Sequence, residues 1–184
     1  MLKKYIKDYA FLLSIAAIII LLDQLTKYFV RTNIHVGNVF LPDLWISQYA
    51  RIVNVKNTGA AFGMFQSLGG VFTILSFIVS LVILYYFPRV PAEDILLRLA
   101  MGMLLGGAVG NLIDRLIQGH VTDFISIWIF PVFNMADLSI TTGVIILFLD
   151  MWWQERHKFS HTDSTSDEEV NAPQQRTTPS LPED

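Results

Sequence analysis

The stretch that decides the fold is residues 102–115, GMLLGGAVGNLIDR. Gly102, Gly106 and Gly110 recur at intervals of four, so on a helix they form a smooth stripe against which another helix backbone can pack closely. The stretch then becomes polar, and one helix face carries Asn111, Asp114 and Arg115. Helix packing accounts for the glycine stripe, and it would hold this polar end tightly against the other helices.

The composition is typical of a membrane protein. Hydrophobic residues make up 53% of the 184 residues and charged residues only 16%, whereas about a quarter of a soluble domain is charged. The chain has no cysteine, which excludes disulfides and thiolate chemistry. Its four histidines have none of the spacings of a metal site, so the sequence predicts no bound metal.

Four apolar stretches are near the length of about 20 residues that a helix needs to cross a bilayer. They cover approximately residues 9–30, 68–87, 95–113 and 136–153. Basic residues are concentrated on one side of them: Lys3, Lys4, Lys7, Arg89, Arg98, Arg156 and Lys158. The positive-inside rule therefore predicts that both termini are cytoplasmic, against a minority of outer basic residues, Arg31, Arg51, Lys56 and Arg115.

These patterns predict an all-α integral membrane protein whose four transmembrane helices lie within residues 1–155. Residues 30–67 hold aromatic and β-branched residues between turn residues, which predicts a small strand-containing cap on the outer side. Residues 114–133 are expected to form a second outer loop. Residues 156–184 are polar and acidic, which predicts a disordered cytoplasmic tail.

Two carboxylates, Asp123 and Asp137, stand 14 residues apart near the start of the fourth apolar stretch. A charged residue at membrane depth costs about 2.5–3.5 kcal/mol on insertion scales, so it needs a compensating role. Helix capping could explain Asn134 and Asp137, because Asn is a favoured N-cap and the first helical turn favours negative charge. Asp123 has no such local explanation. The pair is therefore a candidate for acid–base chemistry, in which two carboxylates share a proton.

Other polar residues map to the same outer ends of the spans. Asp23 and Lys27 are an i, i+4 pair that can neutralise itself on one helix face. Each pair alone is explained by contacts between helices. The convergence of three polar groups on one side of the membrane favours a functional site.

Five sequence blocks resemble, in order, the signature blocks of the bacterial lipoprotein signal peptidase family, or type II signal peptidases. They are Asp23-Gln24-Leu25-Thr26-Lys27, Asn57-Thr58-Gly59-Ala60-Ala61-Phe62, residues 106–115, Val121-Thr122-Asp123-Phe124 and Phe133-Asn134-Met135-Ala136-Asp137. The resemblance covers approximately residues 9–153 and leaves the tail outside it.

The resemblance implies a multi-pass aspartyl peptidase of the bacterial inner membrane that cuts prolipoproteins before a diacylglyceryl-modified cysteine. It makes Asp123 and Asp137 the catalytic pair, facing the periplasm, so that residues 30–67 and 114–133 become a periplasmic cap and a periplasmic catalytic loop. Substrate-binding or supporting residues would be Asn57, Gly59, Asn111, Arg115 and Asn134, and structural polar residues would be Asp23, Lys27 and Asp114. It implies lipid-modified prolipoproteins and membrane lipids as partners, and neither a cofactor, a metal nor nucleic acid.

Two other classes of protein fit parts of the pattern. A small transporter would also carry ionisable residues within a helix bundle, but here the polar groups do not continue toward the cytoplasmic half. A membrane scaffold would use the glycine stripe and the capping residues and would leave Asp123 unexplained. For the catalytic pair we expect Asp137, in the first turn of its helix, to be ionised. We expect Asp123, in an apolar loop near that charge, to be protonated.

Overall fold

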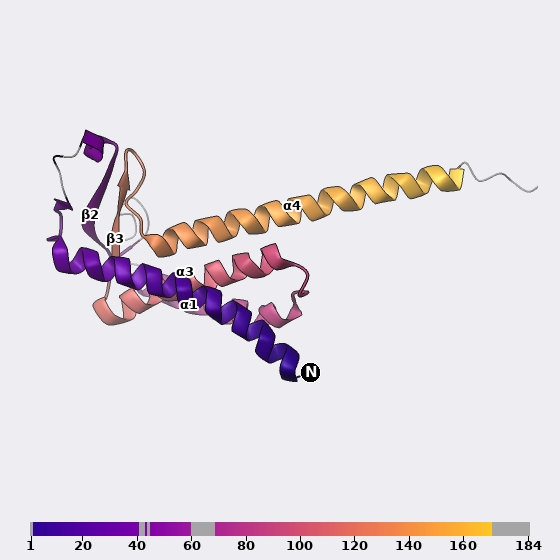
Figure 1. The fold of residues 1–184 in the computed structure, drawn as a ribbon, viewed down its shortest axis with the longest axis horizontal. Helices are drawn as coiled ribbons and strands as arrows, with labels where there is room; N and C mark the ends of the chain where they lie inside the picture. Colours follow the sequence, from indigo (N-terminus) through magenta and orange to yellow (C-terminus); the bar gives the residue numbers. More distant parts are fainter. Residues whose placement is uncertain (1, 41–42, 44, 60–68, 171–184) are drawn as a thin grey trace, which may run out of the picture. The chain divides into compact units, whose positions relative to one another are not determined.

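The computed structural model describes residues 2–40, 43, 45–59 and 69–170. The chain divides into two compact units, Met1–Phe148 and Leu149–Asp184. The elements, in chain order, are α1 (Leu2–Asn33), β1 (Val39–Phe40), the 3-10 turn η1 (Trp45–Gln48), β2 (Ala50–Asn57), α2 (Gly69–Tyr86), the 3-10 turn η4 (Phe87–Arg89), α3 (Ile95–Gln118), β3 (Val121–Ile127) and α4 (Met135–Val170) (Figure 1).

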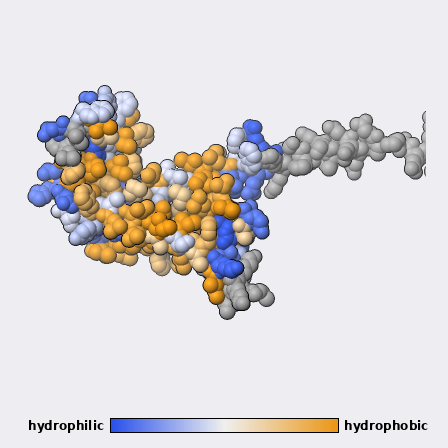
Figure 2. All heavy atoms as spheres, in the orientation of Figure 1, coloured by the Kyte–Doolittle hydropathy of each residue, from blue (hydrophilic) through white to orange (hydrophobic). Residues whose placement is uncertain are grey.

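Within the part of the chain that the structure describes, four helices are long and apolar enough to cross a membrane, which confirms the predicted transmembrane helices. Their apolar stretches are mostly exposed, as expected for side chains that face lipid, and apolar residues cover much of the visible helical surface in Figure 2. The exception is α3. In its apolar stretch 56% of the residues are buried, against 17% in the apolar stretch of each of the other three helices. Packing of α1 and α2 against α3 explains this difference.

The glycine stripe of α3 packs closely against another helix, as predicted, and the structure shows that this helix is α1. A Cβ atom added at Gly102 or Gly106 would lie within 3.0 Å of the side chain of Ile15 or Ile19 on α1. Gly110 leaves room for the carboxylate of Asp23, whose Oδ2 would lie 2.7 Å from the added Cβ. These contacts bring the polar residues at the C-terminal end of α1 within reach of those at the C-terminal end of α3.

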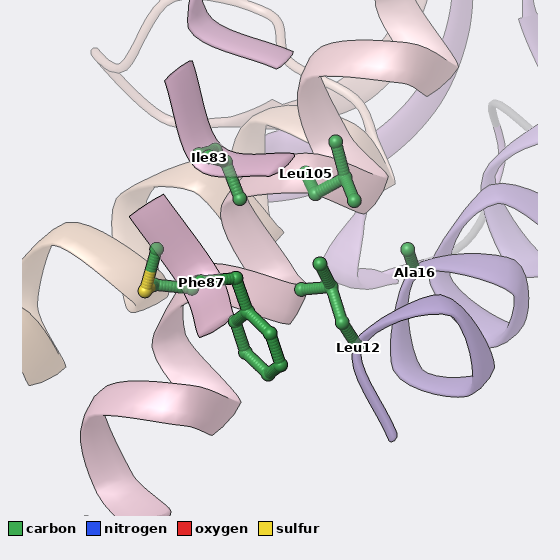
Figure 3. Packing of buried hydrophobic residues seen from close by; sticks show 6 residues of the cluster. Leu12, Ala16, Ile83, Phe87 and Leu105 are labelled. Atoms are coloured by element: carbon green, nitrogen blue, oxygen red, sulfur yellow. The ribbon is translucent and has the colours of Figure 1, made fainter. Parts of the chain in front are cut away.

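The opposite end of the helices is held by a hydrophobic cluster. Leu12 and Ala16 of α1 lie opposite Phe87 of η4 and Leu105 of α3 (Figure 3). Beside this cluster, Arg98 of α3 forms a buried ion pair with Asp8 of α1, with 2.8 Å between Nη2 and Oδ1. The two ends of the α1–α3 contact thus differ in chemistry, because one is mainly apolar and the other is a polar network.

A three-stranded antiparallel sheet in the order β1-β2-β3 completes the larger unit. Asp123 lies on β3, opposite Val55 of β2, and a register irregularity separates Ile52 from Val55. The prediction of a strand-containing cap in residues 30–67 was thus incomplete. The third strand comes from residues 114–133, which were expected to form a loop. Its first residues are buried on both faces, so the sequence lacks the alternation of polar and apolar residues that marks a half-buried strand.

Two helices also extend further than the sequence predicted. The third helix continues through Asp114 and Arg115 to Gln118, and Gly119 ends it in the left-handed conformation with φ of 74°. The fourth helix continues to Val170, although a disordered tail was predicted from residue 156. No Gly or Pro lies between residues 144 and 170 to stop that helix. Residues 171–184 of the predicted tail lie outside the described residues.

Candidate active site

Asp123 is buried on β3, and two side-chain amides hold its carboxylate. Asn57, the last residue of β2, donates from Nδ2 to Asp123 Oδ2 at 2.8 Å, and Asn134 donates from Nδ2 to Oδ1 at 2.6 Å. The amide of Asn57 is oriented by its own turn, because the backbone N–H of Gly59 donates to Asn57 Oδ1 at 2.9 Å. The oxygen of that amide is therefore occupied, and its nitrogen faces Asp123.

Asp137 lies in the first turn of α4, where it forms a capping box with Asn134. The backbone N–H of Asp137 donates to Asn134 Oδ1 at 3.0 Å, and the backbone N–H of Asn134 donates to Asp137 Oδ2 at 3.2 Å. Reciprocal bonds of this kind satisfy donors that the helix itself leaves free. The capping role considered for Asn134 and Asp137 is thus present, and it coexists with their contacts to the site.

Asn111 of α3 connects the two carboxylates through a continuous network of amides. Its Nδ2 donates to Asp137 Oδ1 at 2.8 Å, and its Oδ1 accepts from Asn134 Nδ2 at 3.2 Å. Asn134 therefore contacts Asp123 through its nitrogen and Asp137 through its oxygen. Residues from β2, α3, β3 and α4 are joined in this way around the two aspartates.

Both aspartates line one cavity of about 460 Å³. Its other polar side chains are Asn57, Asn111, Arg115 and Thr141. Its remaining surface is mostly apolar, formed among others by Phe72, Val121, Phe130, Val132, Phe133 and Leu138. The guanidinium of Arg115 lies 5.8 Å from the centre of the Phe72 ring. The cavity therefore combines a carboxylate pair and a cation with room for an apolar ligand.

Burial raises the pKa of the Asp123 carboxyl to about 6, and repulsion from Asp137 acts in the same direction. The amides of Asn57 and Asn134 and the charge of Lys27 oppose this shift, because each stabilises the ionised form. Asp123 therefore takes up a proton far more readily than an exposed carboxylate does. A proton on Asp123 allows it to act as an acid beside the second carboxylate.

All ten predicted site residues lie at the end of the helices that carries the sheet. Asp23, Lys27 and Asp114 do not line the cavity. Lys27 forms ion pairs with the carboxylates of Asp23 and Asp114. Two further members of this cluster, Gln24 and Arg31, were not predicted as site residues from the sequence. Gln24 donates to the side chains of Asp23 and Asp114, and Arg31 contacts Asp114 and Thr122. The spacing of residues 23, 27 and 31 places them on one helix face, which is the signal that could have identified Arg31.

The chain resembles known proteins over most of its length. Residues 15–153 match the sequence profile of the family described as Signal peptidase (SPase) II. The lipoprotein signal peptidase of Moorella thermoacetica is 44% identical over 135 residues, covering 73% of this chain and 88% of the relative. That of Pseudomonas aeruginosa (strain UCBPP-PA14) is 37% identical over 153 residues, covering 76% and 86%. A solved structure described as a bacterial membrane enzyme superimposes with a TM-score of 0.74 at 32% identity, covering 80% of this chain and 90% of the other.

Proposed function

Since the chain belongs to the signal peptidase II family, we propose that it is an aspartic-type endopeptidase that removes signal peptides from prolipoproteins. Asp123 and Asp137 are its catalytic pair. The observation that carries this proposal is that both carboxylates line one cavity and accept hydrogen bonds from Asn134, Asp123 from its side-chain amide and Asp137 from its backbone N–H. A structural role alone would not require two acidic groups from different elements to face the same open space.

In the proposed reaction Asp137 begins as the carboxylate and Asp123 as the acid. Asp137 takes a proton from water while the water oxygen attacks the scissile carbonyl carbon, and Asp123 donates its proton to the carbonyl oxygen. When the tetrahedral intermediate collapses, the C–N bond breaks and the leaving amine takes the proton from Asp137. Asp123 recovers its proton from the former carbonyl oxygen.

The surroundings of the two carboxylates support this division of roles. Asp137 lies at a helix N-terminus, where the helix dipole is favourable to negative charge, and its carboxylate accepts a hydrogen bond from Asn111. Burial and the nearby charge of Asp137 raise the pKa of Asp123 to about 6. A bound substrate that excludes water would favour the protonated form of Asp123 further, because desolvation disfavours the charged form.

The cavity also fits the substrate that the family name implies. We infer that the substrate carries a diacylglyceryl group on the cysteine that follows the scissile bond. An opening lined mostly by apolar side chains suits a lipidated peptide, whose acyl chains can remain in the bilayer. Arg115 and Asn57 face this space and are placed to bind the peptide backbone.

We further propose that the active site faces the periplasm and that the protein lies in the bacterial inner membrane. The sheet and the catalytic pair are at the C-terminal ends of α1 and α3. The basic residues Lys7, Arg89 and Arg98 lie at or near the opposite ends of α1, α2 and α3. By the positive-inside rule that opposite end is cytoplasmic.

A cleavage assay with the purified full-length protein in lipid vesicles tests the proposal. The substrate is a prolipoprotein that carries the diacylglyceryl group, and the same precursor without the lipid is the substrate control. Asp123→Asn and Asp137→Asn should each lower kcat by at least about 100-fold, since acid–base catalysis contributes about 10²–10⁴-fold. Asp150→Asn, on α4 but outside the cavity lining, should retain activity. Cleavage of the lipidated precursor by either catalytic variant at the wild-type rate would refute the catalytic role of that residue.

A further inference from the structure

Lys27 is a fully buried cation at the centre of the polar end of the helices. Its ammonium contacts Asp23 Oδ2 at 2.8 Å on α1, and Asp114 Oδ2 at 3.3 Å and Asn111 Oδ1 at 2.9 Å on α3. A lysine ammonium has three N–H donors, so these partners account for all of them. Lys27 does not line the cavity, and the proposed reaction gives it no step.

Each carboxylate bound to Lys27 also accepts a backbone N–H next to a catalytic aspartate. Asp23 Oδ1 accepts from the backbone N–H of Ala136 at 2.9 Å, and Ala136 immediately precedes Asp137. Asp114 Oδ2 accepts from the backbone N–H of Thr122 at 3.0 Å, and Thr122 immediately precedes Asp123. The two catalytic elements, β3 and α4, are therefore both attached to the same ammonium through one carboxylate each.

The third contact of Lys27 determines the orientation of Asn111. Because an ammonium is only a donor, the amide oxygen of Asn111 must face it. The amide nitrogen of Asn111 then faces Asp137, to which it donates at 2.8 Å. A rotated amide would place its nitrogen against Lys27 and its oxygen against the carboxylate of Asp137, and both contacts would be repulsive.

We propose that Lys27 is a positioning residue that sets the separation of the catalytic pair through Asp23, Asp114 and Asn111. This inference rests on the proposed function. Lys27 and its two carboxylates act as a rigid connection, because a charge buried at this depth is favourable only while all its partners remain in contact. The reacting groups need near-attack geometry, and a misplacement of about 1 Å can cost about 100-fold in rate.

The chain contains a matched control in the ion pair of Asp8 and Arg98. Like Lys27 and its partners, that pair is buried and joins α1 to α3. Its N–O separation of 2.8 Å equals the separation of Lys27 and Asp23 within α1. Arg98 otherwise contacts the carbonyl of Val90 and the rings of Phe11 and Phe87, all at the opposite end of the helices. Loss of either cation should weaken the contact between α1 and α3, but only loss of Lys27 should disturb the catalytic pair.

The first measurement compares Lys27→Met with Arg98→Met in the full-length protein in lipid vesicles. Thermal unfolding gives the stability of each variant, and kcat and KM for the lipidated precursor are measured well below the lower Tm. Both variants should have a lower Tm. Lys27→Met should lower kcat by about 100-fold with little change in KM, whereas Arg98→Met should retain the wild-type kcat. Equal kcat values for both folded variants would overturn the inference.

A pH profile provides a readout that a loss of stability would not change. The charged groups that act on Asp123 are Asp137 on α4, Lys27 on α1 and Arg115 on α3, while β2 contributes the neutral amide of Asn57. The charge of Lys27 lowers the pKa of Asp123. Its removal should therefore move the basic limb of the kcat/KM profile to higher pH, and Arg98→Met should leave that limb unchanged. An unchanged limb in Lys27→Met would contradict the proposed placement of Lys27.

Lys27→Arg covers the case in which Lys27→Met does not fold. The guanidinium retains the charge, but its planar fork cannot reproduce the three contacts of an ammonium. We expect kcat to fall while the basic limb stays near its wild-type position, and a wild-type kcat would overturn the inference. The wild-type protein separates the two proposals: if it does not cleave the precursor, the proposed function fails. If it does cleave and the Lys27 variants keep its kcat, only the positioning role fails.

Discussion

At the scale of single residues, the site depends on amide side chains whose orientation is fixed by a second contact. The oxygen of Asn57 accepts from the backbone of Gly59, and the oxygen of Asn134 accepts from the backbone of Asp137. Each nitrogen is then left to face Asp123. Asp123 therefore receives two donors that cannot rotate away without losing a bond. Such preorganised donors hold the carboxylate that we propose to be catalytic in place before substrate arrives.

Substitution of Asn134 can separate its capping role from its contact with Asp123. Asn134→Ser keeps an oxygen that can cap α4 but removes the nitrogen that donates to Asp123 at 2.6 Å. We expect kcat to fall by about 10- to 100-fold, because a hydrogen bond to a charged group contributes about 1.5–3 kcal/mol. Asn134→Ala should lose the same activity and a further ~1 kcal/mol of stability with the cap. A wild-type kcat in Asn134→Ser would show that this hydrogen bond is dispensable.

The raised pKa of Asp123 makes a prediction about stability and pH. The pKa of Asp123 is about 6 in the folded protein and close to the usual aspartate value of 3.8 in the unfolded chain. Below the lower value Asp123 is protonated in both states and contributes nothing. As pH rises through both values, ionisation penalises the folded state by up to about 3 kcal/mol. The Tm of Asp123→Asn relative to wild type should therefore rise between about pH 4 and pH 7.

Thermal unfolding of both proteins at matched pH values checks this prediction. Other titrating groups are shared by the two proteins and largely cancel in the difference. A difference in Tm that stays constant across the range would mean that folding does not raise the pKa of Asp123.

At the scale of elements, hydropathy and spacing predicted the helices and their polar ends but not the strand that carries Asp123. The apolar stretches predicted the four helices because lipid-facing and core-facing side chains are both apolar. Residues 121–127 are mostly β-branched or aromatic, and this composition favours a strand. The composition could therefore have indicated the strand. The partner of that strand is β2, more than 60 residues earlier in the chain. Single-sequence patterns do not specify a pairing between such distant segments.

The close approach of α4 to α3 gives a prediction at this scale. A Cβ atom added at Gly107 would lie 2.5 Å from the carbonyl oxygen of Ala136, the residue before Asp137. Because that contact is with backbone, Gly107→Ala should displace the start of α4, lower stability by about 1–3 kcal/mol and reduce kcat. Gly70→Ala on α2 is the matched control, since no atom of the described residues lies within 4 Å of its added Cβ. Thermal unfolding and cleavage assays on both variants test this, and equal behaviour would exclude a tight contact at Gly107.

At the scale of the whole molecule, the predicted orientation depends on the distribution of basic residues, and some of these residues have partners inside the fold. Arg31 and Arg51 appeared in the sequence as exceptions on the outer side. In the structure Arg31 is 3.2 Å from Asp114, and Arg51 donates to Ser126 on β3. Arg115 faces the cavity, with the carboxylates of Asp123 and Asp137 nearby. Basic residues that are used inside the fold carry less information about orientation than Lys7 and Arg89, which have no carboxylate partner among the described contacts.

The orientation itself can be measured with reporter fusions. Reporters placed after Asp43, in the cap, and after Pro131, between β3 and α4, should be active only in the periplasm. Reporters placed after Val90 and after Arg156 should be active only in the cytoplasm. The reason is that Lys7, Arg89 and Arg98 lie at or near one end of α1, α2 and α3, which the positive-inside rule assigns to the cytoplasm. Replacing Arg31 by Gln should not change these signals, because Arg31 is paired within the fold. A cytoplasmic signal from the Pro131 fusion would place the catalytic pair on the wrong side for exported precursors and refute the proposed location.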